Sequence, residues 1–278
     1  MALIEQRMTQ ADDGARIAYE VRHEPGASPA ILALHGVLVG TSNWVHQMLR
    51  LPQFHWIAPF FRGHGNSAPA GERPTIERAA YDALAVLDAE DVEQAVVIGN
   101  SLGATVALAL GLLRPERVRG LLLAEPSVPA LLPDRGGDRL SAAARQARVL
   151  LDDGKVDEAL DLFLTPRLGA DWPQKVGRRR LAEWRHNVHS TPAWFDAVMD
   201  FDPGPGPLAA LDIPTLLVYG ANTQPEYREL TLAVADALPP TDLVEVPDAG
   251  HGVPVDNPDA FNALLLEFLE RIGVGGSS

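Results

Sequence analysis

The chain alternates between short apolar runs and longer stretches with helical periodicity. Six runs are mostly apolar over strand length, which is typical of strands that are covered on both faces. They occupy residues 29–34, 54–60, 95–99, 119–124, 215–219 and 243–246. Ahead of them, residues 15–21 alternate polar and apolar after an Asp12-Asp13-Gly14 turn signal. This start predicts an antiparallel hairpin.

Helical stretches separate the apolar runs. They are expected at residues 78–87, after a Thr75 cap, and at residues 104–113, 225–238 and 261–272. Strands that alternate with helices predict an α/β fold with a doubly wound, mostly parallel sheet. In such a sheet, ligands bind beyond the carboxyl ends of the strands.

Residues 133–207 interrupt this alternation. They contain no strand pattern, but amphipathic helices are expected at residues 140–151, 156–164, 174–189 and 192–199. Residues 202–207 read Asp-Pro-Gly-Pro-Gly-Pro, which predicts a linker. We therefore expect one core, made of residues 1–132 and 208–278, with residues 133–207 inserted as a helical cap.

Residues 95–104 combine a strand, a sharp turn and the start of a helix around Ser101. Gly99 and Gly103 flank the serine at the G-x-S-x-G spacing, where any side chain would collide as strand and helix approach each other. The turn lifts the Ser101 hydroxyl out of the sheet. It also points backbone N–H groups, that of Leu102 first, at any oxygen that the hydroxyl attacks.

Composition narrows the range of functions. The 278 residues carry a formal net charge of −14, which disfavours nucleic acid and anionic membrane surfaces as partners. The absence of cysteine excludes disulfides and thiolate chemistry, and no cluster of histidines and carboxylates has the spacing of a metal site. We expect neither metal nor cofactor. The start of the chain has no apolar core of signal-peptide length, and no apolar stretch is long enough to span a membrane, so we expect a cytoplasmic protein.

Further polar residues follow the ends of apolar strands. His35 and His64 precede glycines in turn-rich segments, and we expect them to orient loop backbone rather than to carry protons. Glu125 ends a fully apolar strand, where a carboxylate is costly unless something uses it. His251 lies in the loop before the last helix. A serine hydroxyl needs such an imidazole to take its proton near neutral pH.

With these motifs the sequence resembles the α/β-hydrolase superfamily over nearly the whole chain. The matching features are His-Gly after an early strand, Arg-Gly-His-Gly, the Gly-Asn-Ser-Leu-Gly elbow, the inserted cap and Ala-Gly-His near the end. The resemblance implies that Ser101 is the nucleophile and His251 the general base. It also implies that the N–H groups of Val37 and Leu102 form the oxyanion hole.

The acid of the triad departs from the family's usual place. Members usually carry an aspartate three residues after the glycine that ends the strand at Tyr219, and Thr223 stands there. A family variation places the acid after the strand that follows the elbow helix, where this chain has Glu125. Short segments around Glu125-Pro126 and Gly220 are similar to a branch that includes fungal zearalenone lactonases. Pro126 predicts an extended backbone at Glu125. The other candidates for the acid are Asp248, Asp256 and Glu226.

These features favour a cofactor-free serine hydrolase of a small or medium carboxylic ester or lactone. Asn100 is similar to the elbow residue of hydrolases that cleave carbon–carbon bonds in ring-fission products, so that reaction stays an alternative; otherwise Asn100 supports the turn. A non-catalytic ligand receptor on the same scaffold is a second alternative. Trp184 and Trp194 are candidate pocket walls, and packing against the core is the alternative role for both.

Overall fold

The computed structural model describes residues 3–71, 73–136 and 139–274. Its centre is one eight-stranded sheet with the strand order β1-β2-β4-β3-β5-β6-β7-β8. The strands are β1 (Glu5–Gln10), β2 (Arg16–Arg22), β3 (Ala30–Leu34), β4 (His55–Pro59), β5 (Ala95–Asn100), β6 (Val118–Ala124), β7 (Thr215–Gly220) and β8 (Asp242–Val246). β1 pairs with β2 and β2 with β4 in antiparallel register, and the remaining neighbours are parallel.

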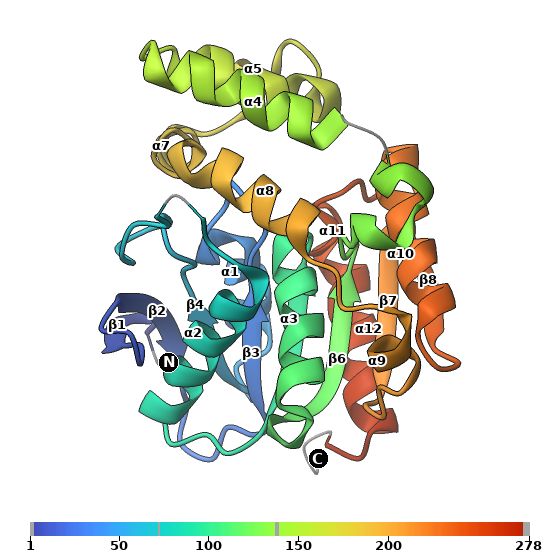
Figure 1. Ribbon diagram of the computed structural model, residues 1–278. Helices are drawn as coiled ribbons and strands as arrows, with labels where there is room; N and C mark the ends of the chain where they lie inside the picture. Colours follow the sequence, from blue (N-terminus) through green and yellow to red (C-terminus); the bar gives the residue numbers. More distant parts are fainter. Residues whose placement is uncertain (1–2, 72, 137–138, 275–278) are drawn as a thin grey trace.

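Helices cover both faces of this sheet (Figure 1). The core helices are α1 (Val45–Arg50), α2 (Ile76–Ala89), α3 (Leu102–Leu113), α9 (Pro205–Ala209), α10 (Pro225–Ala237), α11 (Val253–Asp256) and α12 (Pro258–Arg271). Short 3-10 helices are η1 (Thr41–Trp44), η2 (Pro115–Arg117), η3 (Pro129–Leu131), η4 (Pro133–Gly136) and η5 (Val188–Ser190). The sheet with its flanking helices confirms the predicted α/β class.

Burial on both faces explains why the central strands are continuously apolar. In β5, Val97 packs into a core cluster that includes residues of α2 and α3. Its neighbours Val96 and Ile98 point to the opposite face and pack with residues of α1 and α12. Because successive side chains of a strand alternate between faces, both faces need apolar residues here.

The cap helices lie across the carboxyl ends of the strands (Figure 1). They are α4 (Arg139–Asp152), α5 (Val156–Leu168), α6 (Trp172–Lys175), α7 (Arg178–Asn187) and α8 (Thr191–Asp200). All five fall within residues 133–207, and the boundaries of the cap as a unit stay a prediction. Hydrogen bonds connect the cap to the core. Asn187 Nδ2 donates to the Leu38 carbonyl at 2.9 Å, and Ser42 Oγ donates to the Glu183 carboxylate at 2.7 Å.

Two expectations about this region were wrong. The single helix expected at residues 174–189 is divided into α6 and α7, because Val176 and Gly177 have extended ψ values of 130° and 150°. The stretch expected as a pure linker contains the start of α9. Pro205 occupies the first helical position, where its missing N–H costs nothing, and Gly204 turns the chain into the helix with a φ of 71°.

Within the described ranges, no helix combines the length and the apolar character that crossing a bilayer requires.

Candidate active site

Ser101 lies on the sharp turn between β5 and α3. Its backbone has φ 55° and ψ −120°, a strained conformation for a residue with a side chain. A Cβ at Gly99 would meet the backbone of Gly103 well inside 3.0 Å, and one at Gly103 would meet the Leu34 carbonyl equally closely. Both glycines are therefore required by the packing of strand against helix, as the spacing predicts. Leu102 begins α3, so its N–H has no partner four residues back in the helix.

Glu125 follows the last residue of β6, and its side chain is fully buried. Its two carboxylate oxygens receive separate donors. Oε1 accepts from the Gly220 N–H at 2.9 Å, and Oε2 accepts from Thr223 Oγ1 at 2.8 Å. Oε2 also lies 2.6 Å from Nδ1 of His251. These partners offset the cost of burying the carboxylate, which the sequence alone leaves unexplained.

The backbone of Glu125 corrects one expectation. Its φ is 50°, in the left-handed region, instead of the extended conformation that Pro126 predicts. The Glu125 N–H still donates to the Val218 carbonyl at 3.0 Å, which continues the pairing of β6 with β7. The chain therefore turns out of the sheet at Glu125 itself.

His251 lies in the loop between β8 and α11, with its side chain 11% exposed. Nδ1 is the ring nitrogen that faces Glu125, and Nε2 lies on the opposite side of the ring. Asn100 Nδ2 donates to the backbone carbonyl of His251 at 3.0 Å and to that of Ala124 at 3.3 Å. Asn100 thus links the ends of β5 and β6 to the histidine loop, which is the supporting role weighed for it from the sequence.

The rival carboxylates lie in other arrangements. Asp256 accepts from the Gly250 N–H at 2.9 Å, and burial raises the pKa of its carboxyl group above the ordinary value. Asp248 adopts a positive φ of 55° two residues after the end of β8, and Glu226 lies in the first turn of α10. The structure joins Glu125 to the His251 ring by a hydrogen bond.

Ser101 and His251 line the same cavity of about 290 Å³. Val37, Asn43 and Trp184 also line it. A second, narrower cavity of about 20 Å³ also borders Ser101, and its walls include Val37, Leu102 and Trp194. The two residues expected to supply oxyanion N–H groups therefore both border the nucleophile candidate.

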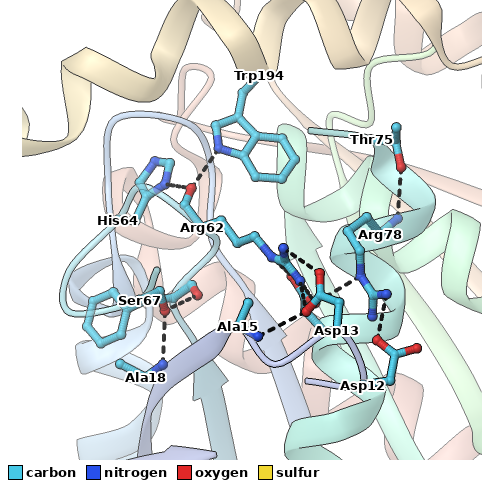
Figure 2. A network of polar contacts seen from close by, with 12 residues as sticks. Asp12, Asp13, Ala15, Ala18, Arg62, His64, Ser67, Thr75, Arg78 and Trp194 are labelled. Carbon is cyan, nitrogen blue, oxygen red and sulfur yellow. Dashed lines mark hydrogen bonds and ion pairs between the residues drawn. The ribbon is translucent and has the colours of Figure 1, made fainter. Parts of the chain in front are cut away.

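The two candidate tryptophans of the cap have different surroundings. Trp184 lines the larger cavity, and its buried indole nitrogen has no hydrogen-bond partner in the part of the chain that the structure describes. Trp194 borders the narrower cavity and donates its indole N–H to the Arg62 carbonyl at 3.0 Å. Figure 2 shows this contact beside the ion pairs of Arg62 with Asp13 and of Arg78 with Asp12. Trp194 therefore both borders the site and anchors the cap.

His35 and His64 orient backbone, as expected. Nε2 of the fully buried His35 accepts from the Phe61 N–H at 3.1 Å, and Nδ1 lies 2.8 Å from the Gly36 carbonyl. Burial lowers the pKa of His35 to about 4. Burial also lowers the pKa of His64 well below its ordinary value. Both rings are therefore neutral near pH 7, and neither borders the two cavities described above.

Three residues of this region escaped sequence reasoning in the roles that they have here. In the sequence, Thr223 stands out only because it occupies the place of the family's usual aspartate. In the structure, its hydroxyl donates a hydrogen bond to the Glu125 carboxylate. Tyr227 stacks on His251, and Asn43 lines the larger cavity, without any motif to indicate either. No grouping of three or more metal-binding side chains occurs among the residues at described positions.

The chain is similar to known proteins in sequence and in structure. The model of the alpha/beta hydrolase family matches residues 31–264. The chain is similar to the 2-hydroxymuconate semialdehyde hydrolase of Pseudomonas sp. (strain CF600), with 27% identity over 271 residues, 89% of each chain. A solved hydrolase from Pseudomonas aeruginosa PA01 is 26% identical with a TM-score of 0.81, covering 95% of this chain and 98% of that one. A solved enzyme that degrades N-acyl homoserine lactone is also 26% identical, with a TM-score of 0.73, covering 94% of this chain and all of the other.

Proposed function

The chain belongs to the alpha/beta hydrolase family, and within that family we propose that it is a serine hydrolase of small or medium carboxylic esters or lactones. The observation that carries this proposal is the 2.6 Å contact between Glu125 and His251, on the cavity that Ser101 also lines. Similarity to a lactone-degrading enzyme supports the choice of substrate class.

In the proposed reaction, His251 takes the proton of Ser101 through Nε2 while the hydroxyl oxygen attacks the substrate carbonyl. Glu125 fixes the tautomer through Nδ1 and stabilises the imidazolium that forms. The N–H groups of Val37 and Leu102 stabilise the negative charge on the carbonyl oxygen. Collapse of this intermediate transfers the proton to the leaving alkoxide and leaves Ser101 acylated. His251 then activates water, which hydrolyses the acyl-enzyme.

The experiment has two parts. A fluorophosphonate should label Ser101 covalently, and one or more members of a panel of aryl esters and lactones should turn over. Labelling without turnover of any model substrate would favour the receptor alternative. Absence of labelling in the folded protein would contradict the proposal.

Carbon–carbon bond hydrolysis is the second candidate, because the chain is similar to a 2-hydroxymuconate semialdehyde hydrolase over 89% of its length. The same nucleophile and base would serve a substrate with a vinylogous diketone. Direct comparison of kcat/KM on vinylogous diketones, aryl esters and lactones separates the two reactions. A preference of about a hundredfold or more for the diketones would replace the ester or lactone assignment.

A further inference from the structure

The ring of Tyr227 lies face to face with the imidazole of His251. The ring centroids are 3.7 Å apart, and the planes differ by 22°. Tyr227 comes from the first turn of α10, which follows β7, whereas His251 follows β8. Only 8% of Tyr227 is exposed, so the stack shields one face of the imidazole from water.

We propose that Tyr227 is a positioning residue of the active site, whose ring fixes the plane of His251 and stabilises its imidazolium form. The inference rests on the proposed function, because it concerns the base of that reaction. Tyr227 also borders the narrow cavity beside Ser101. Tyr227 therefore contacts the base and also borders the space next to the nucleophile.

The hydrogen bond to Glu125 alone does not fix the imidazole. It holds Nδ1 at one point, and the ring can still tilt about the axis of that bond through changes in the side-chain torsions of His251. A flat ring stacked at 3.7 Å blocks this rotation on one side. Nε2 then keeps one direction in every catalytic cycle, which reduces the cost of orienting the base.

The same stack distinguishes the charged from the neutral ring. The face of a tyrosine ring carries partial negative charge, so it attracts an imidazolium more strongly than a neutral imidazole. Since His251 becomes an imidazolium only as it takes the serine proton, this attraction grows on the way to the transition state. Removing it should lower turnover about three- to thirtyfold, the range given by a cation–π contact.

Other charged groups also face His251. Glu125 approaches from the end of β6, and Asp256 approaches from α11, close enough for electrostatic interaction with the imidazole. Both favour the imidazolium and are unchanged by substitutions at Tyr227. A change in the His251 titration on substitution of Tyr227 therefore reports the stacked ring.

The first experiment is an NMR titration of the His251 imidazole in the whole protein. The resonance is identified by its loss in His251→Asn. We expect Tyr227→Leu, which keeps an apolar side chain in place, to titrate about 0.3 to 1 pH unit lower than wild type. Tyr227→Phe should titrate as wild type does, because it retains the ring. Tyr81→Leu, at an exposed tyrosine on α2, is the matched control and should change nothing.

The second experiment follows the rate of fluorophosphonate labelling against pH in the same variants. Tyr227→Leu should be slower, with a profile displaced to lower pH, and Tyr227→Phe should match wild type. Unchanged titration in Tyr227→Leu would overturn the inference. Equal effects of Phe and Leu would also overturn it, because the hydroxyl and not the ring would then matter.

A further variant covers the case in which Tyr227→Leu does not fold. If Tyr227→Leu does not fold, Tyr227→Trp takes its place and should titrate at or above the wild-type midpoint, because indole binds cations best. A lower midpoint in Tyr227→Trp would contradict the role of the ring. The titration needs no activity, so a wild-type protein that neither labels nor turns over substrate would refute the proposed function and leave the test of Tyr227 intact.

Discussion

The carboxylate of Glu125 lies 2.6 Å from Nδ1 of His251, although 126 positions separate the two residues in the chain. The contact brings together the end of β6 and the loop after β8, with β7 between them in the sheet. The Gly220 N–H at the end of β7 completes the arrangement by donating to the same carboxylate at 2.9 Å. Three neighbouring strand ends therefore hold one acid beside one base, and this arrangement yields most of the predictions below.

Ser101→Ala should abolish fluorophosphonate labelling and lower turnover by roughly 10³- to 10⁶-fold, because the hydroxyl supplies the nucleophile. The methyl group of alanine occupies no additional space, so the melting temperature should stay close to that of wild type. Steady-state kinetics on the best substrate of the panel provides the measurement. Residual activity above about one hundredth of wild type would argue against Ser101 as the nucleophile.

Glu125→Gln should lower kcat by roughly 10²- to 10⁴-fold, because an amide cannot stabilise the imidazolium as a carboxylate does. The matched control is Asp256→Asn, which removes a nearby carboxylate that accepts a hydrogen bond from the Gly250 N–H. It should cost less than about tenfold, as should Asp248→Asn and Glu226→Gln. A larger loss in one of these three than in Glu125→Gln would reassign the acid.

Thr223→Asp should restore part of the activity to Glu125→Gln. The Thr223 hydroxyl lies 2.8 Å from the oxygen of Glu125 that contacts His251, so a carboxylate at position 223 reaches the same neighbourhood. We expect a gain of about tenfold over Glu125→Gln alone, measured as kcat. Thr223→Asn in the same background has the same shape without the charge, and an equal gain from it would show that the carboxylate is not responsible.

The stability of the protein should decrease as the pH falls from about 7 to about 4. Burial lowers the pKa of His35 to about 4, whereas the ring titrates at its ordinary value of 6.5 in the unfolded chain. Between these values the unfolded chain binds more protons, so stability is lost as the pH falls. His35 is expected to account for about 2 kcal/mol of the loss in unfolding free energy by pH 5, measured by urea denaturation. His35→Asn should lose this share of the pH dependence, and substitution of the exposed His189 by Gln should retain it.

Trp184→Phe should raise KM about three- to tenfold and leave kcat within about twofold, because a smaller ring reshapes the cavity wall while the groups proposed for the chemistry stay in place. Trp172→Phe is the matched control. Trp172 is also buried in the cap, but its indole donates to Asp161 at 2.7 Å and it does not border the larger cavity. Equal effects of the two variants on KM would mean that Trp184 acts only through the packing of the cap.

The sequence by itself determined the fold class and the local shape of the elbow. Continuous apolar strands predict a sheet covered on both faces, and the spacing of Gly99, Ser101 and Gly103 predicts a strand, a sharp turn and a helix. Short-range chemistry also predicts the Thr75 cap, whose hydroxyl accepts from the Arg78 N–H at 3.0 Å. These features depend on residues that are close together in the chain, so their patterns can be read directly.

The tertiary structure alone decided which distant residues meet. Asp248 and Asp256 are much nearer to His251 in the chain than Glu125 is, yet the parallel order of β6, β7 and β8 brings Glu125 to its ring. The same strand order places Thr223 on Glu125 and Tyr227 on His251. The left-handed turn at Glu125 likewise overrides the extended preference before Pro126, because the hydrogen bonds of the carboxylate and of the pairing with β7 fix it there. Contacts of this kind depend on chain packing, which leaves no periodic signal in a single sequence.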